Sequence, residues 1–212
     1  IVALFYTFVL MLNIVVRYGM GAAFLKNYVP ANKEDRMSIM TNVIISLVLT
    51  GIPFLLLFYF FRENLSLVFF GVVKPSYVVM MGIIIFLDTI WSIPMLALRA
   101  ENRPRLFIFF SFLNVGVTLL CNLVFIIIFK MNIGSIFLSN LIASLIIFIL
   151  VLPYIYQRFR FSSLSIVKWK TILSFALPFL PAGLFAMAME VADRYILKLL
   201  TNLETVGVYN AG

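Results

Sequence analysis

The sequence contains no histidine, a single cysteine and few charged residues. The absence of histidine excludes His-ligated metal sites and imidazole catalysis. Cys121 alone cannot form a disulfide within the chain. Charged residues make up only 11% of the chain, against about 25% in an average soluble domain. We therefore expect no metal site, no cofactor and no ordinary water-soluble domain.

Apolar residues dominate instead and account for 64% of the chain. About 20 mostly apolar residues in a helix cross a bilayer core of about 30 Å, and a helix satisfies its own backbone in lipid. The predicted fold class is all-α, a polytopic transmembrane helix bundle. In addition to its full spans, a further span is expected to start near Thr205. The predicted full spans are residues 1–24, 38–61, 77–98, 106–129, 136–156 and 172–200.

Basic residues outnumber acidic residues by 16 to 8, and they are unevenly distributed. Ten of them lie in three connecting stretches, residues 25–37, 99–105 and 157–171. The alternate loops contain only Arg62, Lys74 and Lys130. The positive-inside rule therefore predicts that the three basic stretches are cytoplasmic. This retention signal explains the basic balance without a nucleic-acid partner.

The chain starts at Ile1 inside an apolar run and ends at Gly212, shortly after a new apolar segment has begun. We therefore expect it to be an internal part of a longer multi-pass protein. A missing signal peptide then carries no information about targeting.

The apolar helix expected over residues 172–200 contains four charged residues. A charge at the centre of a bilayer costs about 2.5–3.5 kcal/mol on insertion scales. At about 100° per residue the four lie within an arc of about 140°, so one face of this helix must line protein or water. An ion pair between residues spaced by four is the structural alternative for the first and third of them. The four are Glu190, Asp193, Arg194 and Lys198.

Two more charges lie within predicted spans. Asp88 is near the middle of its span and must be protonated, paired or turned toward an aqueous cavity. Both a proton or cation site and a structural ion pair remain open for it. Arg17, in the inner part of the first span, is either a snorkelling residue near the interface or an anion contact in a cavity.

Prolines break the charged helix about one-third of the way along, at Pro178 and Pro181. Proline removes a backbone donor and tends to kink a helix. Broken helices serve as hinges and binding-site elements in transporters, although proline is also simply tolerated in membrane helices.

Several short motifs follow one another along the chain. They are Arg17-Tyr18-Gly19, the stretch Leu98–Pro104, Leu177-Pro178-x-x-Pro181, Asp193-Arg194-Tyr195 and Val206-Gly207-Val208-Tyr209. Together they resemble helices two to seven of Wzx-type polysaccharide flippases, within the multidrug/oligosaccharidyl-lipid/polysaccharide exporter superfamily. The resemblance covers essentially the whole chain.

The resemblance implies a two-lobed exporter in the bacterial inner membrane, and no enzyme. Residues 1–156 would form most of the first lobe, 157–171 a cytoplasmic inter-lobe loop and 172–212 the start of the second lobe. The implied substrate is a lipid-linked oligosaccharide of the undecaprenyl-pyrophosphate type, moved to the outer leaflet by alternating access. Arg17 and Arg194 would correspond to the family's inward-facing basic residues. Lys198 is a further candidate substrate contact, while Asp88, Glu190 and Asp193 are candidates for ion coupling or structural pairing.

Other partners and functions stay open. Membrane lipids, a coupling proton or sodium ion and polysaccharide assembly proteins are the further expected partners. A multidrug/cation antiporter of the same superfamily is the nearest alternative, because the intramembrane charges are balanced in sign. A membrane-embedded polysaccharide polymerase or ligase is the enzymatic alternative, although such an enzyme would usually carry a long external loop.

Overall fold

The computed structural model describes the backbone of residues 2–71, 73–131 and 134–200, and the side chains of residues 8–71, 73–131 and 134–189. Every regular element within these residues is helical, which confirms the all-α prediction. The span expected to start near Thr205 lies outside the described residues. In chain order the elements are α1 (Val2–Arg17), α2 (Met20–Tyr28), α3 (Lys33–Phe60), α4 (Arg62–Phe70), α5 (Pro75–Ala100), α6 (Pro104–Ile127), α7 (Gly134–Arg158), η1 (Phe161–Ser163), α8 (Ile166–Ala176) and α9 (Phe179–Leu200).

Among the described residues, five helical segments are long and apolar enough to cross a membrane: α3, α5, α6, α7 and the stretch Ile166–Met189. The bent pair Phe8–Arg17 and Met20–Tyr28 makes a sixth if it is counted as one span. These segments coincide with the six predicted windows, so the chain is a multi-pass membrane protein. Some helices are longer than their windows, because polar residues cap them. Asn32, for example, accepts a hydrogen bond of 2.8 Å from the backbone of Asp35 at the start of α3.

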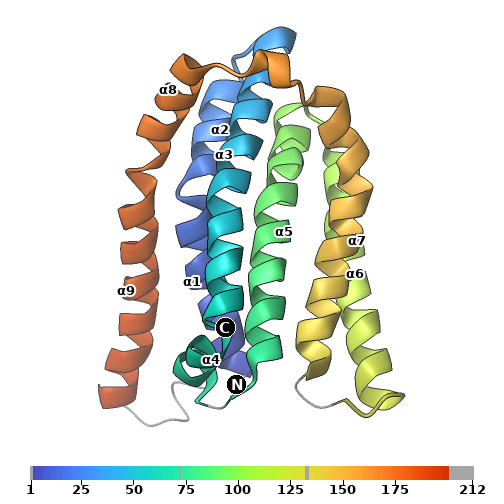
Figure 1. The fold of residues 1–212 in the computed structure, drawn as a ribbon, viewed down its shortest axis with the longest axis vertical. Coiled ribbons are helices and arrows are strands. Elements are labelled where there is room, and N and C mark those ends of the chain that lie inside the picture. The colour runs from blue at the N-terminus through green and yellow to red at the C-terminus, as the bar shows by residue number, and fades with distance from the viewer. Residues whose placement is uncertain (1, 72, 132–133, 201–212) are drawn as a thin grey trace.

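Helix α5 lies at the centre of the bundle (Figure 1). It packs mainly against α3 and α7, and also against α1, α2 and α4. Val78, Met81 and Ile85 on α5 are fully buried. Helix α6 packs chiefly against α7, and none of its residues is buried. Many of its apolar side chains are exposed, as expected for a helix in contact with lipid, while Phe110 and Leu113 pack against the core.

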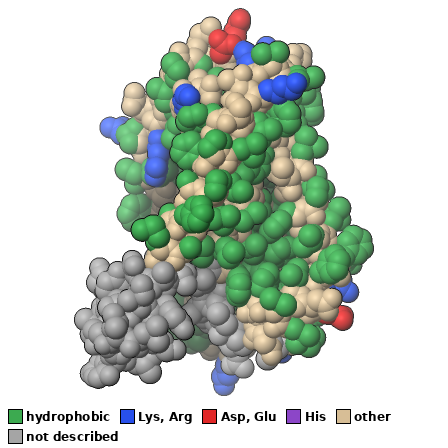
Figure 2. All heavy atoms as spheres, turned by 90° about the vertical axis from the view of Figure 1, so that its left-hand side faces the viewer, with side chains coloured by type: hydrophobic (Ala, Val, Ile, Leu, Met, Phe, Trp, Pro, Cys, Tyr) green, Lys and Arg blue, Asp and Glu red, His purple; other side chains and the backbone are tan. Residues whose placement is uncertain are grey.

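The surface of the molecule has the polarity of a membrane protein. On the face seen in Figure 2, hydrophobic side chains cover the middle, and most charged side chains lie toward the two ends. The three basic stretches connect helices at one end of the bundle, the upper end in Figure 1, while α4 lies at the opposite end. Two of these stretches are largely helical: α2 and α3 are separated only by residues 29–32, and residues 157–171 include η1 and the start of α8.

The first predicted span, residues 1–24, is not one continuous helix. Helix α1 ends at Arg17, α2 begins at Met20 and continues to Tyr28, and the two helices are bent by 47°. The backbone at the break is left-handed, with φ of 32° at Tyr18 and 77° at Gly19. Glycine adopts this left-handed conformation at no steric cost. Hydropathy does not reveal the break, because the apolar pattern continues through both positions.

A second break separates α8 from α9 at residues 177–178, which agrees with the break predicted at Pro178. The two breaks lie against each other. A Cβ atom added to Gly19 would overlap the carbonyl oxygen of Ala176 and the Cβ of Phe179. The two interrupted helices therefore meet at their interruptions, backbone against backbone.

Candidate functional site

A polar cluster lies inside the bundle around Asp88, near the midpoint of α5. Its carboxylate oxygen Oδ1 accepts hydrogen bonds from Ser144 Oγ on α7 at 2.6 Å and from Trp91 Nε1 at 2.8 Å. Arg17, at the end of α1, donates from a terminal guanidinium nitrogen to the main-chain oxygen of Asp88 at 3.1 Å. We call Arg17, Asp88, Trp91 and Ser144 the central polar cluster. Three helices that are far apart in the sequence contribute to it.

Arg17 lies deeper than its position in the sequence indicates. The window 1–24 places it close to the end of a span, where a snorkelling residue would lie. In the structure the helical path continues beyond the break to Tyr28, and Arg17 contacts the midpoint of α5. A contact at the midpoint of α5 favours the interpretation of Arg17 as an anion contact over that of a snorkelling residue.

The guanidinium of Arg17 is only partly satisfied. Its Nε atom is buried and has no hydrogen-bond partner among the described residues. The ion pairs of the described residues do not include Arg17 with Asp88, so the hydrogen bond to the main-chain oxygen is their direct contact, while the two charges attract each other over a longer distance. An arginine fork has five donors. The cluster thus holds a cation with donor capacity left over.

The face of α1 that carries Arg17 contains a second polar residue. Asn13, one turn earlier, donates through Nδ2 to the carbonyl of Val9 at 3.0 Å, and its buried Oδ1 has no partner among the described residues. Residues spaced by four share a helix face. Asn13 and Arg17 therefore form a short polar stripe along α1.

The charged residues of the last helix lie in α9, but their side chains are outside the described residues. These are Glu190, Asp193, Arg194 and Lys198. The preceding turns of α9 do place the helix. Helix α9 packs against α1, and a Cβ on Gly183 would lie 2.8 Å from Cγ2 of Ile14. The helix with the charged face thus runs closely beside the helix that carries Arg17.

Sequence reasoning missed Ser144 and the polar contact at the helix break. Tyr18 Oη and Ser46 Oγ are 2.8 Å apart, and Trp169 Nε1 donates to the same Ser46 oxygen at 3.0 Å. This contact ties the α1–α2 break to α3 and α8. Isolated serines are common in apolar helices, so neither Ser46 nor Ser144 carries a signal in the sequence alone.

The chemistry available in the cluster is that of binding. Within the described part of the chain, no group of three or more Cys, Asp or Glu side chains could hold a metal ion. The cluster offers one guanidinium, one carboxylate, an indole N–H and a hydroxyl. Such a set can bind an oxyanion at the arginine and a proton or small cation at the carboxylate.

Comparison with known proteins gives one match. The model of the family described as polysaccharide biosynthesis protein matches residues 1–212. No curated protein and no solved structure matches the chain.

Proposed function

Since the chain belongs to the polysaccharide biosynthesis protein family, we propose that it translocates a lipid-linked oligosaccharide across the bacterial inner membrane. The substrate is of the undecaprenyl-pyrophosphate type and moves from the cytoplasmic to the outer leaflet. The protein works as a transporter by alternating access, with no chemical step. Family membership supports the role in polysaccharide biosynthesis, and the site supports the transport of an anionic headgroup.

The observation that carries this proposal is the position of Arg17. A lipid tail crosses a bilayer easily, whereas a pyrophosphate with attached sugars does not. A polar path at the centre of the bundle removes that barrier. Arginine stays charged at every physiological pH and binds oxyanions in bidentate fashion. Arg17 lies at the middle of the bundle and has an N–H donor without a partner among the described residues, so it can bind a pyrophosphate while the substrate is translocated.

The rest of the path is assigned to α9 and to the lobe it opens. Arg194 and Lys198 are the further proposed substrate contacts, since α9 packs beside α1. Glu190 and Asp193 balance them. Residues 1–156 form most of the first lobe, 157–171 the inter-lobe connection and 172–212 the start of the second lobe. The two helix breaks that meet at Gly19 are the proposed hinges for the alternation between lobes.

A cation antiporter is the second candidate, and Asp88 is the observation that favours it. A carboxylate held at mid-depth by Ser144 and Trp91 can bind a proton or sodium ion. In the flippase the same residue would couple an ion gradient to export. The two functions differ in the transported molecule. Export of a cationic drug from cells, together with normal surface glycan in a deletion strain, would favour the antiporter.

The experiment is a glycan export assay in a strain that lacks the gene. Arg17→Ala and Arg194→Ala should each abolish surface glycan and leave the lipid-linked precursor inside, while the protein still reaches the membrane. Lysine at either position should rescue only partly, because an ammonium cannot replace the bidentate fork. Arg105→Ala, which removes an exposed arginine at the end of the bundle, is the matched control and should export normally. Normal surface glycan in both the Arg17→Ala and Arg194→Ala strains would refute the proposal.

A further inference from the structure

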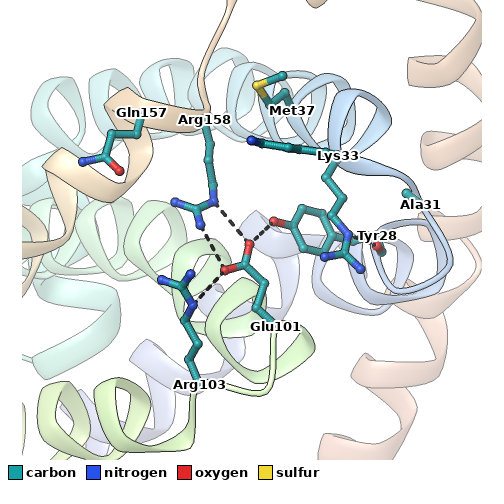
Figure 3. A pocket seen from close by; sticks show the side chains of 9 residues that line it. Tyr28, Ala31, Lys33, Met37, Glu101, Arg103, Gln157 and Arg158 are labelled. Atoms are coloured by element: carbon teal, nitrogen blue, oxygen red, sulfur yellow. Dashed lines mark hydrogen bonds and ion pairs between the residues drawn. The ribbon is translucent and has the colours of Figure 1, made fainter.

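A basic pocket of about 740 Å³ opens at the end of the bundle where the three basic stretches meet (Figure 3). Residues from the ends of α2, α5 and α7, from the start of α3 and from the short connections line it. Such a volume falls in the range of small-molecule sites, about 300–1,000 Å³. The lining residues are Tyr28, Ala31, Lys33, Arg36, Met37, Glu101, Arg103, Gln157 and Arg158.

Glu101 organises the pocket. Its Oε1 accepts a hydrogen bond from Tyr28 Oη at 2.8 Å and one from Arg158 Nε at 3.2 Å, and its Oε2 accepts from a terminal nitrogen of Arg158 at 3.0 Å. Arg103 Nε lies 3.6 Å from the same Oε2. Burial alone would raise the pKa of Glu101, but the hydrogen bond from Tyr28 and the charge of Arg158 outweigh it and hold the pKa below its usual value. The carboxylate is therefore ionised and fully engaged.

The remaining charge in the pocket is positive. Four basic side chains and one carboxylate line the pocket, and that carboxylate already has its partners. Lys33 is exposed and forms no ion pair with any described residue, and the side chain of Arg103 is 53% exposed. Arg36 differs, because its guanidinium donates to the carbonyls of Tyr28 and Val29 at 3.2 Å each and so braces the wall. Lys33 is therefore a cation of the pocket without an ion-pair partner among the described residues. Arg103 is a half-exposed cation whose ion pair is the 3.6 Å contact with Glu101 drawn in Figure 3.

The pocket is separate from the central polar cluster. Glu101 follows Asp88 by thirteen residues along α5, which corresponds to about 20 Å at 1.5 Å per residue. That is more than half the thickness of a bilayer core of about 30 Å. An anion bound in the pocket cannot touch Arg17 at the same time.

We infer that this pocket binds the diphosphate group of the substrate at the cytoplasmic end, before the headgroup moves to Arg17. The inference takes its ligand from the proposed function and adds a loading site to it. A diphosphate monoester or diester carries two or more negative charges, which matches the surplus of cations. Arginine and lysine at the rim capture phosphate oxygens, and the sugars extend into the space beside Gln157.

Binding of farnesyl diphosphate to the protein in phosphatidylcholine nanodiscs tests the inference. Lys33→Gln combined with Arg103→Gln removes both exposed cations. It also removes the 3.6 Å ion pair of Arg103 with Glu101, but leaves the hydrogen bonds of Glu101 with Tyr28 and Arg158 in place. Affinity should fall about tenfold, since each charge-assisted hydrogen bond lost is a substantial part of such a site. Arg105→Gln combined with Lys170→Gln is the matched control, because it removes the same charge from exposed positions at the same end that do not line the pocket. The control should change affinity less than about twofold.

Competition identifies the chemistry of the ligand. Inorganic pyrophosphate should displace farnesyl diphosphate from the unmodified protein, because the diphosphate carries the recognition. Phosphatidylglycerol added to the nanodisc should not displace it. Equal weakening by the two double variants, or displacement by phosphatidylglycerol, would overturn the inference and leave a surface that attracts any anionic lipid. Binding is measured without transport, so glycan export can fail or succeed independently of this result.

Discussion

The guanidinium of Arg17 and the main-chain oxygen of Asp88, 71 positions apart in the chain, are joined by a hydrogen bond of 3.1 Å. The carboxylate of Asp88 is bonded elsewhere, to Ser144 and Trp91. The carboxylate and the guanidinium therefore have different hydrogen-bond partners, although the two charges attract each other. The hydrogen bonds of one can be altered while those of the other remain in place.

Asp88→Asn should separate charge from hydrogen bonding. The amide oxygen can still accept from Ser144 and Trp91, so these hydrogen bonds should persist, and any loss in the free energy of unfolding should come from the missing attraction to Arg17. If Asp88 couples ion movement to transport, glycan export should fall and lose its dependence on the pH gradient or on sodium. Export in inverted vesicles, measured with each gradient in turn, checks this result.

Two further variants accompany that measurement. Ser144→Ala removes one hydrogen bond and keeps the charge, so gradient dependence should persist. Arg17→Gln combined with Asp88→Asn should restore export only if the two residues act as a pair. Full export by Asp88→Asn alone, with unchanged pH and sodium dependence, would leave Asp88 without a role in coupling.

Alanine variants of three glycines distinguish the cost of backbone strain from the cost of disturbing the contact between the helix breaks. Alanine at Gly19 meets both costs: the left-handed backbone, about 1–2 kcal/mol for a non-glycine residue, and overlap with Ala176. Alanine at Gly71, with φ of 68° and open space around it, meets only the first. Alanine at Gly116, inside α6 with no atom within 4 Å, meets neither and should be neutral or slightly stabilising.

Thermal unfolding of the three glycine variants in detergent gives the comparison. The apparent Tm should fall most for Gly19→Ala, less for Gly71→Ala and not at all for Gly116→Ala. If Gly19→Ala and Gly71→Ala lower Tm equally, the close approach of the two breaks contributes nothing to stability.

Glu101 should make the stability of the bundle end depend on pH. Its folded pKa lies below the ordinary value of 4.5, so its stabilising contribution is complete above that value and is lost as the pH falls through the folded pKa. Glu101→Gln should lower Tm by about 2–4 °C at pH 7, for a loss of about 1 kcal/mol. The difference between variant and unmodified protein should then shrink as the pH drops below 4.5. A constant difference from pH 7 to pH 3 would show that the carboxylate charge is not the stabilising feature.

The three basic stretches should lie in the cytoplasm, as the positive-inside rule predicts. Ser162→Cys in η1 and Asn64→Cys in α4 place exposed thiols at opposite ends of the bundle, in a Cys121→Ser background. In intact cells an impermeant maleimide should label the cysteine at 64 and spare the one at 162. Labelling of the cysteine at 162 instead would reverse the orientation.

Hydropathy alone was sufficient to place the membrane-spanning helices. Proline at the first position of α5 and α6 marks their starts, and apolar composition sets their lengths. The bend after Arg17 was missed, because Tyr18 and Gly19 continue an apolar pattern and the left-handed turn is held by contact with Ala176, far along the chain. The residues around the bend do not indicate that contact.

The position of Asp88 in the middle of a predicted span identified it as a candidate, because a carboxylate there is costly in whichever direction it points. Its contacts with Ser144 and Arg17 followed only from the packing of α5 against α7 and α1. The basic pocket likewise could not be predicted from the sequence. It is lined by charges that are far apart along the chain, among them Arg36, Glu101 and Arg158. Only the folded bundle brings them together around one pocket.

The contact between the two helix breaks also has a consequence for synthesis. At about 5–20 residues per second, the chain needs on the order of ten to thirty seconds to grow from Gly19 to Ala176. Throughout that interval the bent first span sits in the membrane without the helix that later closes against it. Helix α3 is already made, and Ser46 is available to bond with Tyr18. The order of emergence from the ribosome thus makes α3 the first support of the bend, and Trp169 can bond to the same Ser46 hydroxyl only after α8 has been made.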